Sequence, residues 1–227
     1  MKRAVSEALG ELRALSDPSR LEGMARYAIP AGLGVTINEL RALANRLGTD
    51  HELALGLWGT GIHEARLLAG FVEDPALVTE EQMEQWAADF DSWDLCDQVC
   101  GLFEQTRFAW NKAREWSRRD EEFVKRAAFA IVAGLAVHDR VAADAVFIRF
   151  LSTVRRAATD DRNFVKKAVS WALRNIGKRN LVLNAAALDT AETLRGSISR
   201  SARWIGSDAA RELASEKVRS RLRPPRG

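Results

Sequence analysis

The sequence predicts an all-α fold, a curved solenoid (α/α superhelix) of stacked helical hairpins with a concave basic face. Three observations predict it. Apolar residues recur three and four positions apart along most of the chain, short breaks divide these segments, and one segment recurs at a fixed interval. No segment has the alternating pattern of a strand. We expect one domain over residues 1–222, followed by a flexible carboxyl-terminal tail over residues 223–227.

The breaks between helices are marked by proline, glycine, asparagine and aspartate. They are expected near residues 17–18, 29–34, 48–50, 56–61, 73–75, 89–92, 120, 139, 159–162, 177–180 and 207–208. The segments between them have roughly 10 to 18 residues, and the connections are short. This spacing is typical of paired antiparallel helices.

An internal repeat supports the solenoid. The sequence DEEFVKRA at residues 120–127 recurs 41 residues later as DRNFVKKA at residues 161–168. An interval of this length is typical of HEAT repeats, whose two-helix units bury their apolar faces only when they stack. The sequence therefore predicts HEAT-like helical-hairpin repeats, with a surface suited to a long ligand.

The charge is unevenly distributed along the chain. Residues 1–120 carry 13 basic and 20 acidic side chains, whereas residues 121–227 carry 21 and 11, so the net charges are −7 and +10. A basic half on a nearly neutral protein indicates a polyanion as the partner. The alternative, a solvated charged surface without a partner, remains open.

Other features of the composition narrow the function. The amino terminus lacks the apolar segment of a signal peptide, and no apolar run approaches the roughly 20 residues of a membrane span, so we expect a soluble, cytoplasmic protein. We also expect it to be a monomer. Cys96 and Cys100 are four positions apart, which favours core packing. The glycine-rich residues 56–61 lack the context of a nucleotide-binding loop and are interpreted as a tight turn. The three histidines, His51, His63 and His138, have no metal-ligand spacing, and no metal or cofactor is expected.

The segment at residues 92–103 contains the first candidate site. At about 100° per residue, Trp93, Asp97, Gly101 and Glu104 lie together, opposite an apolar face made by Leu95, Cys96, Val99, Leu102 and Phe103. An aromatic ring one turn before a carboxylate, away from the core, indicates a binding or catalytic site. A tryptophan that lies between repeats is the alternative.

A second candidate site lies on the helix expected at residues 164–178. Val165, Ala168, Val169, Ala172 and Ile176 form its apolar stripe, while Lys167, Arg174 and Lys178 form a basic stripe with Trp171 at its edge. In the preceding repeat, Lys125 and Arg126 occupy the positions of Lys166 and Lys167. Cations at regular intervals beside an aromatic ring are typical of a surface that binds nucleic acid. We expect Trp93, Asp97, Arg126 and Trp171, each of which lies off the apolar stripe of its helix, to converge on the concave face.

These residues carry a resemblance to a known family. The elements are Met-Ala-Arg-Tyr at residues 24–27, Ser-Trp-Asp-x-x-Asp at 92–97, Arg-Ala-Ala at 126–128, and Lys-Ala-x-x-Trp-x-Leu-Arg at 167–174. With them, the chain resembles the AlkD-like DNA alkylation repair family, DNA glycosylases built from HEAT-like repeats. The sequence departs from the family pattern in a shorter turn at residues 28–34, which bears on the amino-terminal DNA contacts, and in Ser92, where a second aromatic residue can precede the site tryptophan.

The resemblance implies that the protein excises N3- and N7-alkylated purines from double-stranded DNA by hydrolysis of the N-glycosidic bond, without a base-flipping pocket. The implied catalytic residues are Asp97, Trp93, Trp171 and Arg126. The implied DNA-binding residue Tyr27 lies on an amino-terminal helix, and the cations of the second site, Lys125, Lys166, Lys167, Arg174 and Lys178, contribute to DNA binding. The alternative is a non-catalytic HEAT-repeat module that binds damaged or branched DNA by the shape of its backbone.

Overall fold

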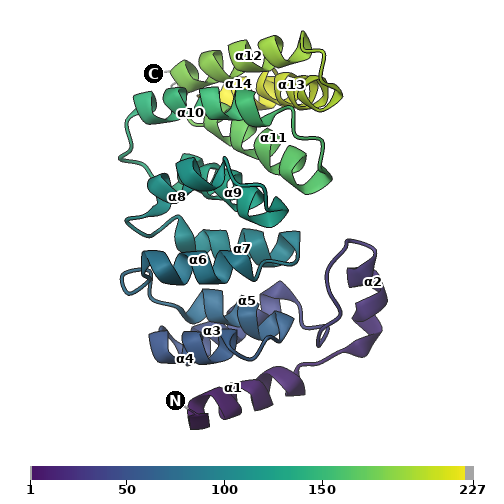
Figure 1. Cartoon of the computed structure of the whole chain (residues 1–227), viewed down its shortest axis with the longest axis vertical. Helices are drawn as coiled ribbons and strands as arrows, with labels where there is room; N and C mark the ends of the chain where they lie inside the picture. Colours follow the sequence, from purple (N-terminus) through teal and green to yellow (C-terminus); the bar gives the residue numbers. More distant parts are fainter. Residues whose placement is uncertain (1, 223–227) are drawn as a thin grey trace. The chain divides into compact units, whose positions relative to one another are not determined.

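The computed structural model of the chain describes residues 2–222, and within them the secondary structure is all-helical (Figure 1). The expected tail at residues 223–227 lies outside the described residues. No helix among the described residues is long and apolar enough to cross a membrane. The chain divides into two compact units, of which unit 1 ends at Phe108 and unit 2 begins at Ala109, and the expectation of a single domain stays a prediction.

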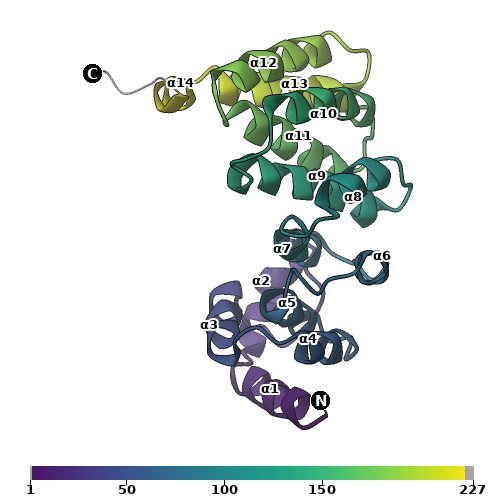
Figure 2. The same ribbon diagram turned by 90° about the vertical axis from the view of Figure 1, so that its left-hand side faces the viewer.

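The helices of each unit follow one another along the chain (Figures 1 and 2). Unit 1 contains α1 (Lys2–Ala14), the 3-10 helix η1 (Pro18–Arg20), α2 (Leu21–Ala25), α3 (Ile37–Leu47), α4 (His51–Trp58), α5 (His63–Val72), α6 (Glu80–Ala88) and α7 (Trp93–Phe103). Unit 2 contains α8 (Ala109–Trp116), α9 (Glu122–His138), α10 (Asp144–Ala157), α11 (Asn163–Gly177), α12 (Leu181–Arg195), α13 (Arg200–Leu213) and α14 (Glu216–Leu222).

Aromatic and aliphatic side chains form the core of unit 1. Trp58 of α4 and Trp86 of α6 stack with ring centroids 4.0 Å apart, and Phe103 of α7 lies against Trp86. The apolar face expected on α7 is buried, and it includes Cys96 and Cys100 as free thiols. The prediction that these cysteines belong to the core is confirmed.

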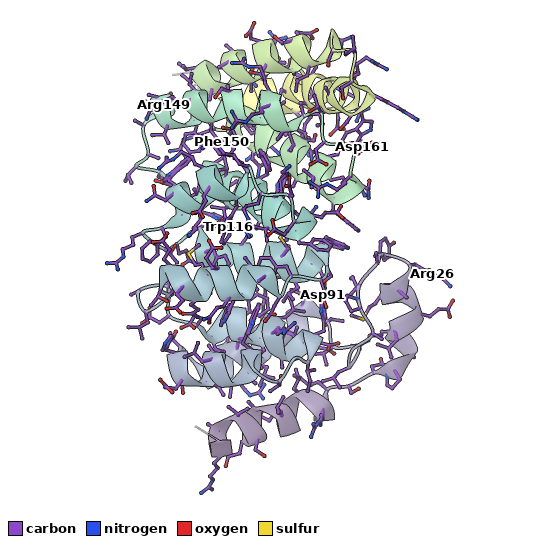
Figure 3. The ribbon with its side chains drawn as sticks, viewed as in Figure 1. Arg26, Asp91, Trp116, Arg149, Phe150 and Asp161 are labelled. Atoms are coloured by element: carbon purple, nitrogen blue, oxygen red, sulfur yellow. The ribbon has the colours of Figure 1, made fainter. Side chains whose placement is uncertain are left out.

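In unit 2, α11 packs against both α9 and α13, and the three helices run in the same direction. Phe150 of α10, labelled in Figure 3, packs edge-on against Phe129 of α9 and Trp110 of α8. The apolar stripe expected on α11 is buried throughout. Alternate helices therefore form one packed layer, as the repeat predicts.

The helix boundaries differ from the expected ones in several places. The break expected at residues 207–208 is wrong, because α13 continues to Leu213 and the carboxylate of Asp208 accepts a hydrogen bond from Ser170 of α11. The polar pair lies on a helix surface instead of in a turn. Breaks that the sequence analysis missed separate α7 from α8 and α12 from α13. The glycine-rich segment turns only after Trp58, where Gly61 has a φ of +71°.

Candidate nucleic-acid interface

Trp93 begins α7, and its indole is fixed by a contact with the amino-terminal part of the chain. The half-buried ring donates a hydrogen bond from Nε1 to the backbone carbonyl of Tyr27, with a length of 2.7 Å. Asp97 follows one turn later and is also half-buried, whereas the apolar residues of α7 are buried. The prediction that Trp93 and Asp97 share a side of the helix away from the core is therefore confirmed.

Tyr27 lies in the turn that follows α2, and the expectation of a helical position is wrong. The five-residue α2 ends at Ala25, and Ala28 has a φ of +56°, a left-handed backbone that a continuing helix does not allow. The Tyr27 side chain is 71% exposed. Its backbone therefore holds Trp93 while its phenol ring faces solvent.

The short turn at residues 28–34 is held by Glu64, a buried carboxylate of α5. Oε1 of Glu64 accepts hydrogen bonds from the backbone N–H groups of Leu33, at 2.7 Å, and Gly34, at 2.8 Å. A side chain at Gly32 has no space, because its Cβ would lie 2.2 Å from Oε2 of Glu64. The sequence analysis missed Glu64, since nothing local distinguishes it from a surface glutamate.

A second buried pair joins the beginnings of α5 and α7. Nε2 of His63 lies 2.9 Å from Oδ2 of Asp94, and the side chains of the two residues are 4% and 8% exposed. Burial alone would lower the pKa of His63, but the hydrogen bond to Asp94 and the negative charges of Asp94, Glu64 and Asp91 raise it. Burial would raise the pKa of Asp94, but the bond to His63 and its charge lower it.

Asp94 follows Trp93 directly in the sequence, and the sequence analysis missed its pairing with His63. Two signals could have found it: Asp94 falls on the buried side of α7, and His63 lies at the start of the preceding apolar helix. A buried carboxylate requires a partner. The pair therefore fixes the end of α7 that carries Trp93.

In unit 2, Arg126 is only 6% exposed. Its Nη1 donates a hydrogen bond of 2.7 Å to the backbone carbonyl of Phe164, at the start of α11. The expectation that Arg126 lies off the buried side of its helix is therefore not met, because the guanidinium connects two neighbouring helices. Trp171, on α11, is half-buried as expected.

Most of the cations expected to bind DNA form ion pairs. Nζ of Lys125 lies 3.2 Å from Asp160, Arg174 Nη1 lies 2.6 Å from Glu212, and Lys178 Nζ lies 2.9 Å from the same carboxylate. The bonds to Arg174 and Lys178 outweigh burial and lower the pKa of Glu212.

Two cations of α11 differ from these. Lys167 is exposed and makes no ion pair within residues 2–222. Lys166 places its ammonium 5.0 Å from the ring centroid of Trp204 on α13. Trp204 is 42% exposed and was not among the expected site residues, although its position beside Arg203 was a signal.

The structure thus brings Tyr27 and Trp93 together in unit 1, with Asp97 one turn away. In unit 2, it brings Arg126 to the start of α11, the helix that carries Trp171. The convergence of Trp93 and Asp97 with Arg126 and Trp171 stays a prediction.

Comparisons with known proteins give a matching family model and a similar solved structure. The model of the family described as "DNA alkylation repair enzyme" matches residues 8–213. No curated protein matches the chain. A solved structure is similar with a TM-score of 0.79 and 20% sequence identity, covering 96% of this chain and 95% of the other. That protein is described as one of a new family related to the HEAT-like repeat DNA glycosylases, with affinity for branched DNA structures. The all-α, HEAT-like fold expected from the sequence is thereby confirmed.

Proposed function

This protein belongs to the DNA alkylation repair enzyme family, and we propose that it is a monofunctional glycosylase that excises N3- and N7-alkylated purines from duplex DNA. The observation that carries the proposal is the pairing of Trp93 and Asp97 on the non-core side of α7. Trp93 is oriented by its bond to the carbonyl of Tyr27, and Asp97 lies one turn along. A carboxylate beside an oriented aromatic face suits a reaction in which positive charge develops on a sugar.

The chemistry places few demands on the protein. An N3- or N7-alkylated purine is already cationic and leaves with its bonding electrons, so the enzyme chiefly stabilises positive charge on the deoxyribose. In the proposed reaction, the Asp97 carboxylate supplies a fixed negative charge and orients the water that attacks the anomeric carbon. The tryptophan faces of Trp93 and Trp171 stabilise the same charge, at about 0.5–2 kcal/mol each.

The hydrogen bond of Trp93 supports this role. An indole ring free to rotate would lose side-chain entropy when it packed against the sugar. In this chain, Nε1 is already bound to the carbonyl of Tyr27, which fixes the direction of the ring before DNA arrives. An oriented aromatic group stabilises the transition state at a smaller entropic cost.

The proposal is tested with Asp97→Asn, which keeps the size of the side chain and removes its charge. We expect single-turnover release of 7-methylguanine to fall roughly a hundredfold or more, because one electrostatic contact of this kind contributes about 3 kcal/mol. Affinity for undamaged duplex should stay within severalfold. Glu52→Gln, which removes an exposed carboxylate of α4 in the same unit, is the matched control and should excise normally.

Both variants are assayed on one preparation by base release, thermal melting and DNA titration. Normal excision by folded Asp97→Asn would remove Asp97 from the reaction. A fall in excision that merely follows a fall in melting temperature would assign Asp97 a folding role.

A second function is favoured by the ion pairs of unit 2. Because Arg174 and Lys178 form ion pairs with Glu212, Arg174 also faces Asp208, and Arg126 is buried, we expect fewer phosphate contacts than the charge of this half suggests. These pairs favour a non-catalytic module that recognises branched DNA, the property described for the similar solved structure. Wild-type protein that releases no 7-methylguanine but prefers branched DNA to linear duplex would support this alternative.

A further inference from the structure

Three contacts between α11 and α13 share one register. Each joins residues 38 positions apart, and the pairs are Lys166 with Trp204, Ser170 with Asp208, and Arg174 with Glu212. Successive pairs are one helical turn apart. The register therefore places an aromatic side chain at the beginning of the two helices and carboxylates towards their ends.

This register determines where positive charge remains available. At the far end, Glu212 accepts bonds from Arg174 and Lys178, and Asp208 lies 3.4 Å from Arg174, so two carboxylates face these two cations. At the near end, Lys166 faces the neutral ring of Trp204. The charge of the α11–α13 layer is therefore available near the amino-terminal ends of both helices.

Other cations lie at the same end. On α13, the exposed Arg200 lies one turn before Trp204, and the exposed Arg203 is adjacent to it in the sequence. On α11, Lys167 follows Lys166. We call Lys166, Lys167, Arg200, Arg203 and Trp204 the Trp204 patch.

The patch rests on an ordered support. Ser201 donates a hydrogen bond of 2.7 Å to the carbonyl of Asp160. Asp160 lies in the turn before α11, next to Asp161, which is labelled in Figure 3. Arg203 donates to the carbonyls of Ser197 and Ile198 at 3.0 and 2.7 Å. These three bonds hold the start of α13 against its surroundings, so the exposed ring of Trp204 projects from a fixed backbone.

An exposed indole beside several cations fits one kind of nucleic acid in particular. Continuous duplex presents phosphates and sugars, while its base faces are covered by stacking. An unpaired nucleotide presents a phosphate for the cations and a base face for the ring. We infer that the Trp204 patch binds an unpaired nucleotide of a single-stranded arm, as found at a fork or flap.

This inference rests on the proposed DNA-binding function and deepens it. It supplies a reason for branched DNA to be preferred, since linear duplex offers the cations a phosphate but offers Trp204 no base. The preference would arise in unit 2 alone, and it holds whether the protein excises a base or only binds.

The test measures the affinity of the protein for a blunt duplex and for a fork with one single-stranded arm. The two DNAs have the same total length, and neither contains a lesion. For Trp204→Ala we expect the ratio of fork to blunt affinity to fall by about five- to a hundredfold, the range that corresponds to one base–aromatic stack. Trp204→Phe should keep part of the preference. Val182→Ala, at an exposed apolar residue of α12, is the control and should leave the ratio unchanged.

A second measurement uses 2-aminopurine in the single-stranded arm. Stacking on Trp204 should quench its fluorescence with the wild-type protein and much less with Trp204→Ala. An unchanged ratio together with unchanged quenching would overturn the inference, and it would leave Trp204 as a residue for a protein partner. Release of 7-methylguanine from continuous duplex, measured on the same preparations, reports the proposed function separately, so that either can fail without the other.

Discussion

Asp94 provides the sharpest test of how unit 1 is held together. The change is Asp94→Ala, which removes the partner of His63 from a site where both side chains are less than a tenth exposed. Breaking a buried charged pair on one side costs about 3–5 kcal/mol, because the remaining group stays buried without compensation. We take the lower value, about 3 kcal/mol, which corresponds to a fall in melting temperature of about 6–12 °C for a chain of this size.

The loss of unfolding free energy in Asp94→Ala should depend on pH, because the pKa values of both His63 and Asp94 change on folding. The folded-state pKa of His63 is raised above its ordinary value of 6.5, so its contribution is fully present below pH 6.5 and is lost as the pH rises through the folded pKa. The pKa of Asp94 is lowered below 3.8, so its contribution is present above pH 3.8 and is lost as the pH falls through the folded value. The difference in unfolding free energy between wild type and Asp94→Ala should therefore be largest between pH 3.8 and 6.5.

The assay is urea unfolding followed by circular dichroism at a series of pH values. Gln98→Ala, on the same helix as Asp94, is the control. It removes an exposed hydrogen bond from Arg41 of α3 and should lower the free energy of unfolding by less than about 0.5 kcal/mol at every pH. His63→Ala and the double variant complete a double-mutant cycle. A flat pH profile, or additive effects of the two single changes, would refute the reasoning.

Three further predictions concern other contacts. Glu64→Gln should lower the free energy of unfolding by about 1.5–3 kcal/mol, because it weakens two hydrogen bonds to a charged acceptor, and hydrogen exchange should accelerate at the two amides of the turn. Gly206→Ala should destabilise by about 1–3 kcal/mol in a thermal melt, since its Cβ would lie 2.5 Å from a carbonyl oxygen of α12, whereas Gly10→Ala in the exposed part of α1 should stabilise by up to about 1 kcal/mol. Lys167→Gln should reduce the log–log salt slope of duplex binding by about 0.9, and ion-paired Lys178→Gln should reduce it less; equal slopes for these two variants would contradict the argument from ion pairing.

Patterns that repeat within one helix were predictable from the sequence. The apolar faces of α7 and α11 follow from the helical period alone, and so does the position of Trp93 and Asp97 on the other side of α7. The repeat at an interval of 41 residues predicted the stacked hairpins in the same way. These predictions succeed because burial of a helix face depends on residues three and four positions apart.

Contacts between helices were not predictable in this way. The partner of Arg174 lies 38 residues away, and the partner of His63 lies 31 residues away. The helical period of α11 contains no information about which helix packs against it. The sequence therefore predicted that its cations bind phosphate, whereas Arg174 and Lys178 form ion pairs. Arg126 was misplaced for the same reason, because its acceptor is a backbone carbonyl of α11 and leaves no mark in the sequence.

The two carboxylates of the Trp-Asp-x-x-Asp segment have different environments, and this difference bears on what a family match implies. Asp94 is buried against His63, where its loss would disturb the start of α7, whereas Asp97 lies half-buried beside Trp93. A relative that kept the first carboxylate and lost the second would retain the geometry of α7 and lack the charge proposed to stabilise the sugar. The fold can therefore depend on Asp94 without reporting on Asp97, and the proposed role of Asp97 is tested only by base release. Under the proposed mechanism, a HEAT-like protein without the Asp97 carboxylate would bind DNA through unit 2 and excise no base.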